Sequence, residues 1–230
     1  MKKYFITLIC FCATVNSFAQ FSIGAKAGLV IADFHPTYIT NSKTGFKAGL
    51  SLQYMFSEWG LQTGAYFKEV GISHSRGFVR YDGDPENLHL TTMKSNLEYF
   101  EIPLTLVYKY SIDQHVKIGI HAGPYLSIGY GGSAVIHIED IQSGFSVDSF
   151  EDDWISNVNE QRVIKKQFKG ANKIDLGLTG GLGVDIYNVN ISANYDLGLS
   201  NVYKEFPISK NIKNVKNRAF WIAIAYHFQW

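Results

Sequence analysis

A strict alternation of residue types in the last segment of the chain constrains the fold more than any other feature. From Ala219 to Trp230 every even position holds a large apolar or aromatic residue, whereas the odd positions hold alanines together with Trp221, His227 and Gln229. Successive side chains of a β-strand point to opposite faces, so the segment predicts a strand with one wholly apolar face. The pattern recurs in residues 21–31, 45–56, 61–68, 100–110, 116–130, 174–186 and 189–199. The sequence therefore predicts eight strands.

Eight strands can close into either of two barrel classes, which orient their apolar faces oppositely. A soluble lipocalin-type barrel is apolar inside, whereas an outer-membrane barrel is apolar outside. Here the apolar face carries large residues and no charge, while the other face mixes small residues with charged ones. We therefore expect an all-β fold, an eight-stranded antiparallel up-and-down transmembrane β-barrel. Its predicted lumen network comprises Lys26, Lys47, Lys68, Glu101, Lys109, Lys117, His121, Asp175, Asp185 and Asp196.

The lengths of the connections support a membrane barrel independently. Long gaps follow the first, third, fifth and seventh strands, and gaps of a few residues follow the others. Outer-membrane barrels have short periplasmic turns and long external loops, so we expect external loops at residues 34–44, 72–96, 138–172 and 202–216, and allow for a short helix from Glu151 to Glu160. The same topology predicts a periplasmic aromatic girdle of Tyr54, Phe56, Trp59, Tyr108, Tyr110, Tyr187, Phe228 and Trp230.

The N-terminus predicts export. Two lysines, an apolar run and Ser17-Phe18-Ala19 are typical of a signal peptide spanning residues 1–19, which leaves residues 20–230 as the barrel domain. The apolar run is shorter than the roughly 20 residues of a transmembrane helix. Both cysteines lie in this leader, so we expect no disulfide or thiol chemistry in the mature chain. Without Lys2 and Lys3 the chain has 19 basic and 20 acidic residues. It therefore lacks the excess of positive charge that is typical of nucleic-acid-binding proteins.

Several short segments resemble the PorT-like outer-membrane β-barrel family. They are Lys26-Ala27-Gly28-Leu29, residues 97–104 (LEYFEIPL), His121-Ala122-Gly123-Pro124-Tyr125, Gly180-Gly181-Leu182-Gly183 and Lys216-Asn217-Arg218-Ala219-Phe220. The resemblance covers essentially the whole mature chain. It implies an eight-stranded outer-membrane barrel in bacteria with type IX secretion or gliding machinery. The secretion-linked members begin with a longer segment before the first strand, which this chain lacks.

The loops contain three patterns that a ligand or catalytic site could use. Residues 82–87 (DGDPEN) space oxygen atoms as calcium loops do, without the closing glutamate. His74 with Ser73, Ser75 and Asp82 is the best set for a lipid hydrolase, although adjacency in sequence is not triad geometry. The loop at residues 138–172 is acidic and then basic, which suits lipopolysaccharide phosphates; its charged residues are Glu139, Asp140, Asp148, Glu151, Asp152, Asp153, Arg162, Lys165, Lys166 and Lys169.

We expect no catalytic, cofactor or metal site. The predicted function is a non-enzymatic binding or structural role through the external loops or the periplasmic rim. The alternatives are an accessory component of type IX secretion or gliding, an outer-membrane lipid hydrolase, and a small-solute pore. The expected partners are outer-membrane lipid and lipopolysaccharide, the barrel-assembly machinery, and secretion or gliding components. Pro103 and Pro124 lie inside predicted strands, where proline removes a ladder hydrogen bond, so we expect a β-bulge near each.

Overall fold

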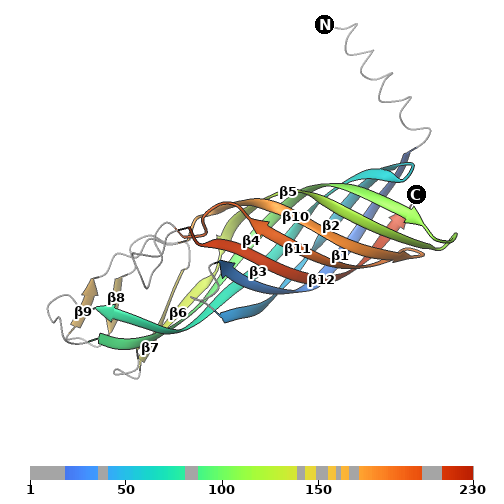
Figure 1. Ribbon diagram of the computed structural model, residues 1–230. Helices are drawn as coiled ribbons and strands as arrows, with labels where there is room; N and C mark the ends of the chain where they lie inside the picture. The colour runs from blue at the N-terminus through green and yellow to red at the C-terminus, as the bar shows by residue number, and fades with distance from the viewer. Residues whose placement is uncertain are drawn as a thin grey trace, which may run out of the picture.

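The computed structural model is a closed, eight-stranded antiparallel barrel (Figure 1). It describes the backbone of residues 19–35, 41–80, 88–138, 143–148, 155–158, 162–165, 171–203 and 214–229. Side chains are described for residues 21–33, 42–71, 96–133, 171–203 and 214–228. Among the described residues, no helix is long and apolar enough to span a membrane.

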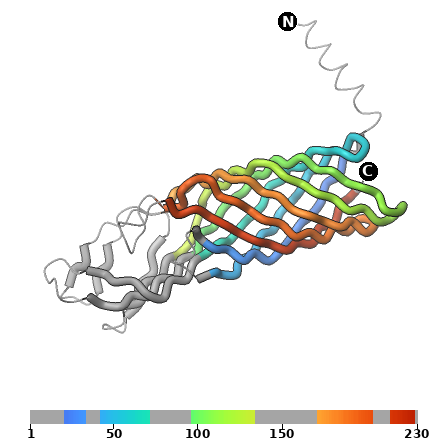
Figure 2. Tube along the Cα trace, in the orientation of Figure 1, coloured from blue at the N-terminus to red at the C-terminus, as the bar shows by residue number. Residues whose placement is uncertain are grey.

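Neighbouring barrel strands follow one another along the chain, and pairing of β3 with β4 closes the ring. The barrel strands are β1 (Ala19–His35), β2 (Asn41–Phe56), β3 (Trp59–Arg80), β4 (Leu88–Ser111), β5 (Val116–Gly131), β10 (Ile174–Ile186), β11 (Val189–Gly198) and β12 (Lys216–Gln229). Each contains all or nearly all of one of the eight predicted segments, so the predicted fold class is confirmed. Figure 2 shows these strands inclined to the barrel axis, as closure of a sheet requires.

The two ends of the barrel differ in their connections. At the short-turn end, β2 and β3 are joined by Ser57 and Glu58, and β10 and β11 by Tyr187 and Asn188. Ser57 and Tyr187 have φ of 63° and 54°, and a positive φ is what tight hairpin turns require. The start of β1 and the end of β12 also lie at this end, because Ser22 pairs with Gln229. The opposite end, here the long-loop end, has all the long connections.

The strands extend beyond the barrel at the long-loop end, which corrects the predicted loop boundaries. β3 continues to Arg80 and β4 begins at Leu88, so most of residues 72–96 form a hairpin instead of a loop. β6 (Ser133–Ile138) pairs with β4, and β7 (Ser143–Asp148) pairs with β6. β8 (Ile155–Val158) and β9 (Arg162–Lys165) form a separate two-stranded sheet, so the helix allowed for at residues 151–160 is wrong where the backbone is described.

The two mid-strand prolines do not produce the predicted bulges. β5 pairs with β10 in one continuous register through Pro124. The β4–β5 register is also the same on either side of Pro103, although pairs are missing next to it. A proline without N–H therefore removes ladder bonds here without inserting an extra residue, and the Thr63 hydroxyl donates a 2.7 Å hydrogen bond to the Pro103 carbonyl.

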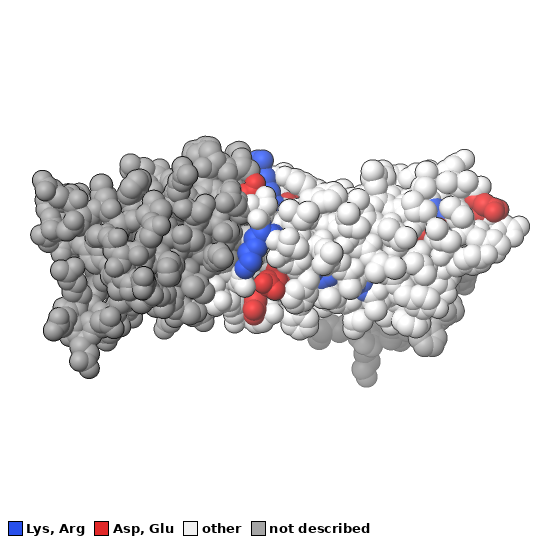
Figure 3. Space-filling model, turned by 90° about the horizontal axis from the view of Figure 1, so that it is seen from below, with Lys and Arg blue, Asp and Glu red and all other residues white. Residues whose placement is uncertain are grey.

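The outer surface of the barrel is an apolar band. Large apolar side chains point outward on every barrel strand, for example Leu29 (68% exposed) and Leu182 (66%). Figure 3 shows a broad surface almost free of charged atoms, with charged groups gathered toward its two ends. This is the orientation of an outer-membrane barrel, in which lipid covers the apolar face.

Candidate functional site

The lumen of the barrel holds three layers of side chains. An apolar cap lies at the long-loop end, a charged cluster lies in the middle, and a polar cavity opens at the short-turn end. Because side chains alternate along each strand, the residues opposite the lipid-facing positions supply most of these layers. The lumen is therefore the best-defined candidate site in the part of the chain that the structure describes.

The charged cluster joins two lysines and two carboxylates. The Lys47 Nζ atom lies 2.5 Å from Glu101 Oε1 and 3.3 Å from Asp196 Oδ2. The Lys68 Nζ atom lies 2.9 Å from Glu101 Oε2 and 2.6 Å from Asp196 Oδ2. All four side chains are at most 2% exposed. Lys47 and Lys68 are direct cross-strand neighbours, and like charges in that position repel unless acids lie between them. Glu101 and Asp196 supply those acids.

Neutral donors complete the coordination of the two carboxylates. Asp196 Oδ1 accepts hydrogen bonds from the Thr179 hydroxyl at 2.7 Å and from the Trp221 indole at 3.1 Å. Ser127 donates to Glu101 Oε2 at 3.2 Å. Lys47 and Lys26 also lie 4.0 Å and 4.6 Å from the centre of a Trp221 ring, which is cation–π distance. The charged cluster and these neighbours together include one residue from each barrel strand: Lys26, Lys47, Lys68, Glu101, Ser127, Thr179, Asp196 and Trp221.

The apolar cap closes the lumen above the cluster. Leu97 and Tyr99 from β4 are at most 1% exposed, and they pack with Val202 and Tyr203 from the connection between β11 and β12. Below them, Asp175 accepts hydrogen bonds from Ser200 at 2.7 Å, Tyr125 at 3.1 Å and Asn217 at 3.3 Å. Ser200 belongs to the connection between β11 and β12, whereas Asp175 belongs to β10. Their hydrogen bond therefore attaches this connection to the barrel wall.

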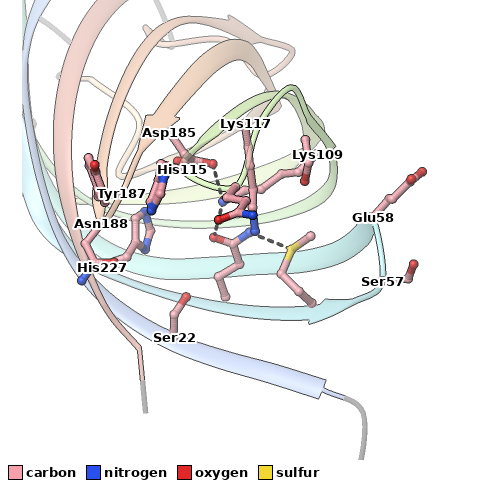
Figure 4. A pocket seen from close by; sticks show the side chains of 14 residues that line it. Ser22, Ser57, Glu58, Lys109, His115, Lys117, Asp185, Tyr187, Asn188 and His227 are labelled. Atoms are coloured by element: carbon pink, nitrogen blue, oxygen red, sulfur yellow. Dashed lines mark hydrogen bonds and ion pairs between the residues drawn. The ribbon is translucent and has the colours of Figure 1, made fainter.

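The polar cavity, here called the vestibule, opens at the short-turn end and has a volume of about 480 Å³ (Figure 4). Lys109 crosses it to reach Asp185 at 2.8 Å and Gln53 at 3.2 Å. The Asn190 amide holds the other Asp185 oxygen at 2.8 Å. The vestibule lining consists of Ser22, Gln53, Met55, Ser57, Glu58, Lys109, Ser111, Gln114, His115, Lys117, Asp185, Tyr187, Asn188 and His227.

The structure brings the predicted lumen residues together in separate groups. Lys47, Lys68, Glu101 and Asp196 form the central cluster, and Lys26 and His121 line small cavities beside it. Lys109, Lys117 and Asp185 belong to the vestibule. Asp175 lies apart, beneath the cap. Trp221 and His227 were not among the predicted residues, although both occupy odd positions of the last strand and so share the lumen face.

The predicted girdle residues that the structure describes lie at the short-turn end. Trp59 and Tyr108 pair across β3 and β4 with ring centres 4.8 Å apart, and the rings of Tyr226 and Phe228 are 4.9 Å apart. Trp230 lies outside the described residues. A second group of outward aromatic residues near the long-loop end was missed; it comprises Phe46, Phe67, Phe100, Tyr130, Tyr195 and Phe220. On β4, Phe100 to Tyr110 spans about 25 Å at roughly 3.3 Å per residue and a tilt of roughly 40°.

The candidate sites in the loops fall largely outside the described residues. Asp82 and the rest of the calcium-like stretch lie there, as does most of the acidic and basic segment between Glu139 and Lys169. Ser73, His74 and Ser75 belong to strand β3 instead of a loop, and only their backbone is described. Within the described residues, no group of three His, Cys, Asp or Glu side chains could hold a metal ion.

Comparison with known proteins agrees with this architecture. The family described as outer membrane protein β-barrel domain matches residues 18–204. No curated protein gives a match. Neisserial surface protein A is 15% identical with a TM-score of 0.42, over 91% of this chain and 99% of that chain. The attachment invasion locus protein Ail of Yersinia pestis, solved with the heparin analogue sucrose octasulfate, is 17% identical with a TM-score of 0.36, over 91% and 97%.

Proposed function

Because the chain belongs to the outer membrane protein β-barrel domain family, we propose that its barrel is a closed, non-enzymatic anchor that presents the extended strands of the long-loop end to a binding partner. The observation that carries this proposal is the filled lumen. The cap and the charged cluster occupy the cross-section of the barrel in two successive layers. Eight strands leave an interior that side chains can fill, so a conduit for solutes is disfavoured.

The extension beyond the barrel supports a binding role at that end. Long connections are external in outer-membrane barrels, so we assign the long-loop end to the cell exterior. There β3 and β4 continue as a hairpin past the membrane band, and β6 and β7 add further strands to β4 (Figure 1). A sheet built from backbone ladders offers a more ordered binding surface than an irregular loop. Lipopolysaccharide is one proposed partner, through the charged residues of this segment.

The proposal is tested by replacing residues 139–170 with a short glycine–serine linker. Tagged full-length protein and the replacement variant are purified in parallel from mildly solubilised outer membranes, and the co-purified proteins and lipopolysaccharide are quantified. We expect a partner or lipopolysaccharide that is recovered with the full-length protein and is reduced at least tenfold with the variant. A gel comparison of unboiled and boiled samples confirms that the variant barrel is folded. Equal recovery with a folded variant would contradict binding through this segment.

The resemblance to PorT-like barrels supports a second proposal, an accessory role in type IX secretion or gliding. Its structural support is the vestibule, a polar cavity that would face the periplasm. Deletion of the gene should then abolish export of type IX cargo. Normal export in the deletion strain would remove this proposal and leave the anchor proposal standing.

Residues 1–19 are proposed to be removed as a signal peptide before the barrel-assembly machinery inserts the chain. The intact mass of protein from purified outer membranes should therefore correspond to a chain that starts at Gln20. A mass that includes the leader would contradict this.

A further inference from the structure

The vestibule lining carries two lysines and two carboxylates, of which only Lys109 and Asp185 form an ion pair with each other. Lys109 is neutralised by Asp185 at 2.8 Å. The Glu58 carboxylate lies on an exposed turn at the edge of the cavity, where it accepts a hydrogen bond from Tyr108 at 3.1 Å (Figure 4). Lys117 has no ion pair with any described residue, and the imidazoles of His115 and His227 also line the space. The cavity therefore offers hydrogen-bond donors, on Lys117 and the two imidazoles, that form no ion pair with the carboxylates of the lining.

Two deeply buried groups at the inner end of the vestibule also lack polar partners. His227 is 7% exposed, and its Nδ1 atom has no hydrogen-bond partner among the described residues. Behind it lies a small cavity of about 20 Å³, which shares Gln53, Lys109, Asp185 and His227 with the vestibule and reaches Lys26. Lys26 is 6% exposed and has no hydrogen bond or ion pair within the described part of the chain, and its ammonium lies 4.6 Å from the centre of a Trp221 ring. An unpaired buried cation is costly unless an anion or water compensates it.

The remaining lining determines the size and polarity of what could bind. A volume of about 480 Å³ is within the range of small-molecule sites. Apart from Met55, the lining side chains are hydroxyls, amides, imidazoles and charged groups, which suit a ligand rich in hydrogen-bonding atoms. Tyr187 and His115, whose rings are 4.5 Å apart, form one wall.

We propose that the vestibule is a binding site for a small polar anion, whose carboxylate or phosphate group is held by Lys117 and His227 and is attracted from below by Lys26. The ligand enters from the short-turn end, which is the periplasmic side by the topology of such barrels. This site is separate from the external strands of the proposed function, and it holds whether or not those strands bind a partner.

The test uses the purified full-length barrel in detergent micelles at low salt, with binding measured by titration calorimetry. Three probes distinguish the source of the anion: tri-alanine with a free C-terminal carboxylate, tri-alanine amide, and glycerol 3-phosphate. We expect at least one of the two anionic probes to bind and the amide to bind at least tenfold more weakly. Preference for tri-alanine would identify a peptide carboxylate, and preference for glycerol 3-phosphate would identify a phosphate ester.

Substitutions locate the site. Lys117→Gln and His227→Asn should each weaken binding of the anionic probe at least tenfold. Lys173→Gln is the matched control, because Lys173 is an exposed lysine beside β10 at the long-loop end, and it should leave binding unchanged. Heat modifiability on gels shows that each variant is folded. The proposal is overturned if neither anionic probe binds at concentrations up to about 10 mM, tenfold above a millimolar Kd. It is also overturned if folded Lys117→Gln and His227→Asn bind the probe as well as the parent protein does.

Discussion

The buried lysines of the lumen are stabilised by the central cluster as a unit. Lys47 and Lys68 each contact both Glu101 and Asp196, so loss of one acid leaves two cations with one counter-charge. We expect Glu101→Leu to lower the free energy of unfolding by about 3 kcal/mol, because removing one partner of a buried pair leaves an uncompensated charge. Urea titration in phospholipid vesicles, followed by tryptophan fluorescence, measures this loss.

The matched control removes one charge of each sign. In Lys68→Met combined with Glu101→Leu, the Lys47 and Asp196 pair remains, so the double variant should be more stable than Glu101→Leu alone. The opposite order, or a Glu101→Leu protein as stable as the parent, would show that water in the lumen screens these charges.

Residue patterns predict which side chains face the lumen but not which of them meet. Two-residue alternation places Glu101 and Asp196 on the polar face, and both are buried there. Lys47 and Asp196 come from strands on different sides of the barrel, and their contact depends on the stagger between strands, which no local pattern contains. Alternation also places Trp221 on the lumen face, but no local pattern indicates that its indole donates a hydrogen bond to Asp196.

At the scale of the strand, glycines allow neighbouring backbones to approach closely. A Cβ atom on Gly123 of β5 would lie 2.0 Å from the Leu104 carbonyl oxygen of β4, whereas one on Gly180 of β10 would lie 3.3 Å from its nearest neighbour. We expect Gly123→Ala to destabilise the barrel by about 2 kcal/mol or more, as overpacking against rigid backbone does. Gly180→Ala is the matched control and should cost much less. The temperature at which the folded gel band disappears compares the two, and equal values would contradict a close approach at Gly123.

Strand boundaries were predictable only within the membrane band. There one face must be apolar, so the alternation is strict and all eight segments could be recognised. Beyond the band no lipid requires an apolar face, so residues 72–80 and 88–95 lack the pattern although they form strands. The bulges expected at Pro103 and Pro124 failed for a different reason: a missing ladder bond can be tolerated without a change of register.

For the whole molecule, the lipid-facing band predicts how the cost of a charge depends on depth. Leu50 is 59% exposed and lies midway between Phe46 and Tyr54, while Leu61 is 47% exposed and pairs with Tyr54 at the girdle. We expect Leu50→Arg to cost about 2 to 4 kcal/mol in vesicles and Leu61→Arg no more than about 1 kcal/mol, because the penalty falls toward the interfaces. Urea titrations of both variants measure the difference. Equal costs would place the membrane band elsewhere on the barrel.

Because the apolar cap and the charged cluster both fill the lumen, we expect the barrel to be impermeable to ions. Measuring its conductance distinguishes an anchor from a pore. In planar bilayers the parent protein should give no steady potassium chloride conductance, in contrast to a general porin measured under the same conditions. Tyr99→Ala opens only the cap, and Lys68→Ser with Glu101→Ser opens only the cluster while leaving charge balanced. Each of these variants should stay closed because the other layer remains, and only the combination of all three substitutions should conduct. Steady conductance by the parent protein would mean that the layers do not seal the barrel, and the anchor proposal would then give way to the small-solute pore.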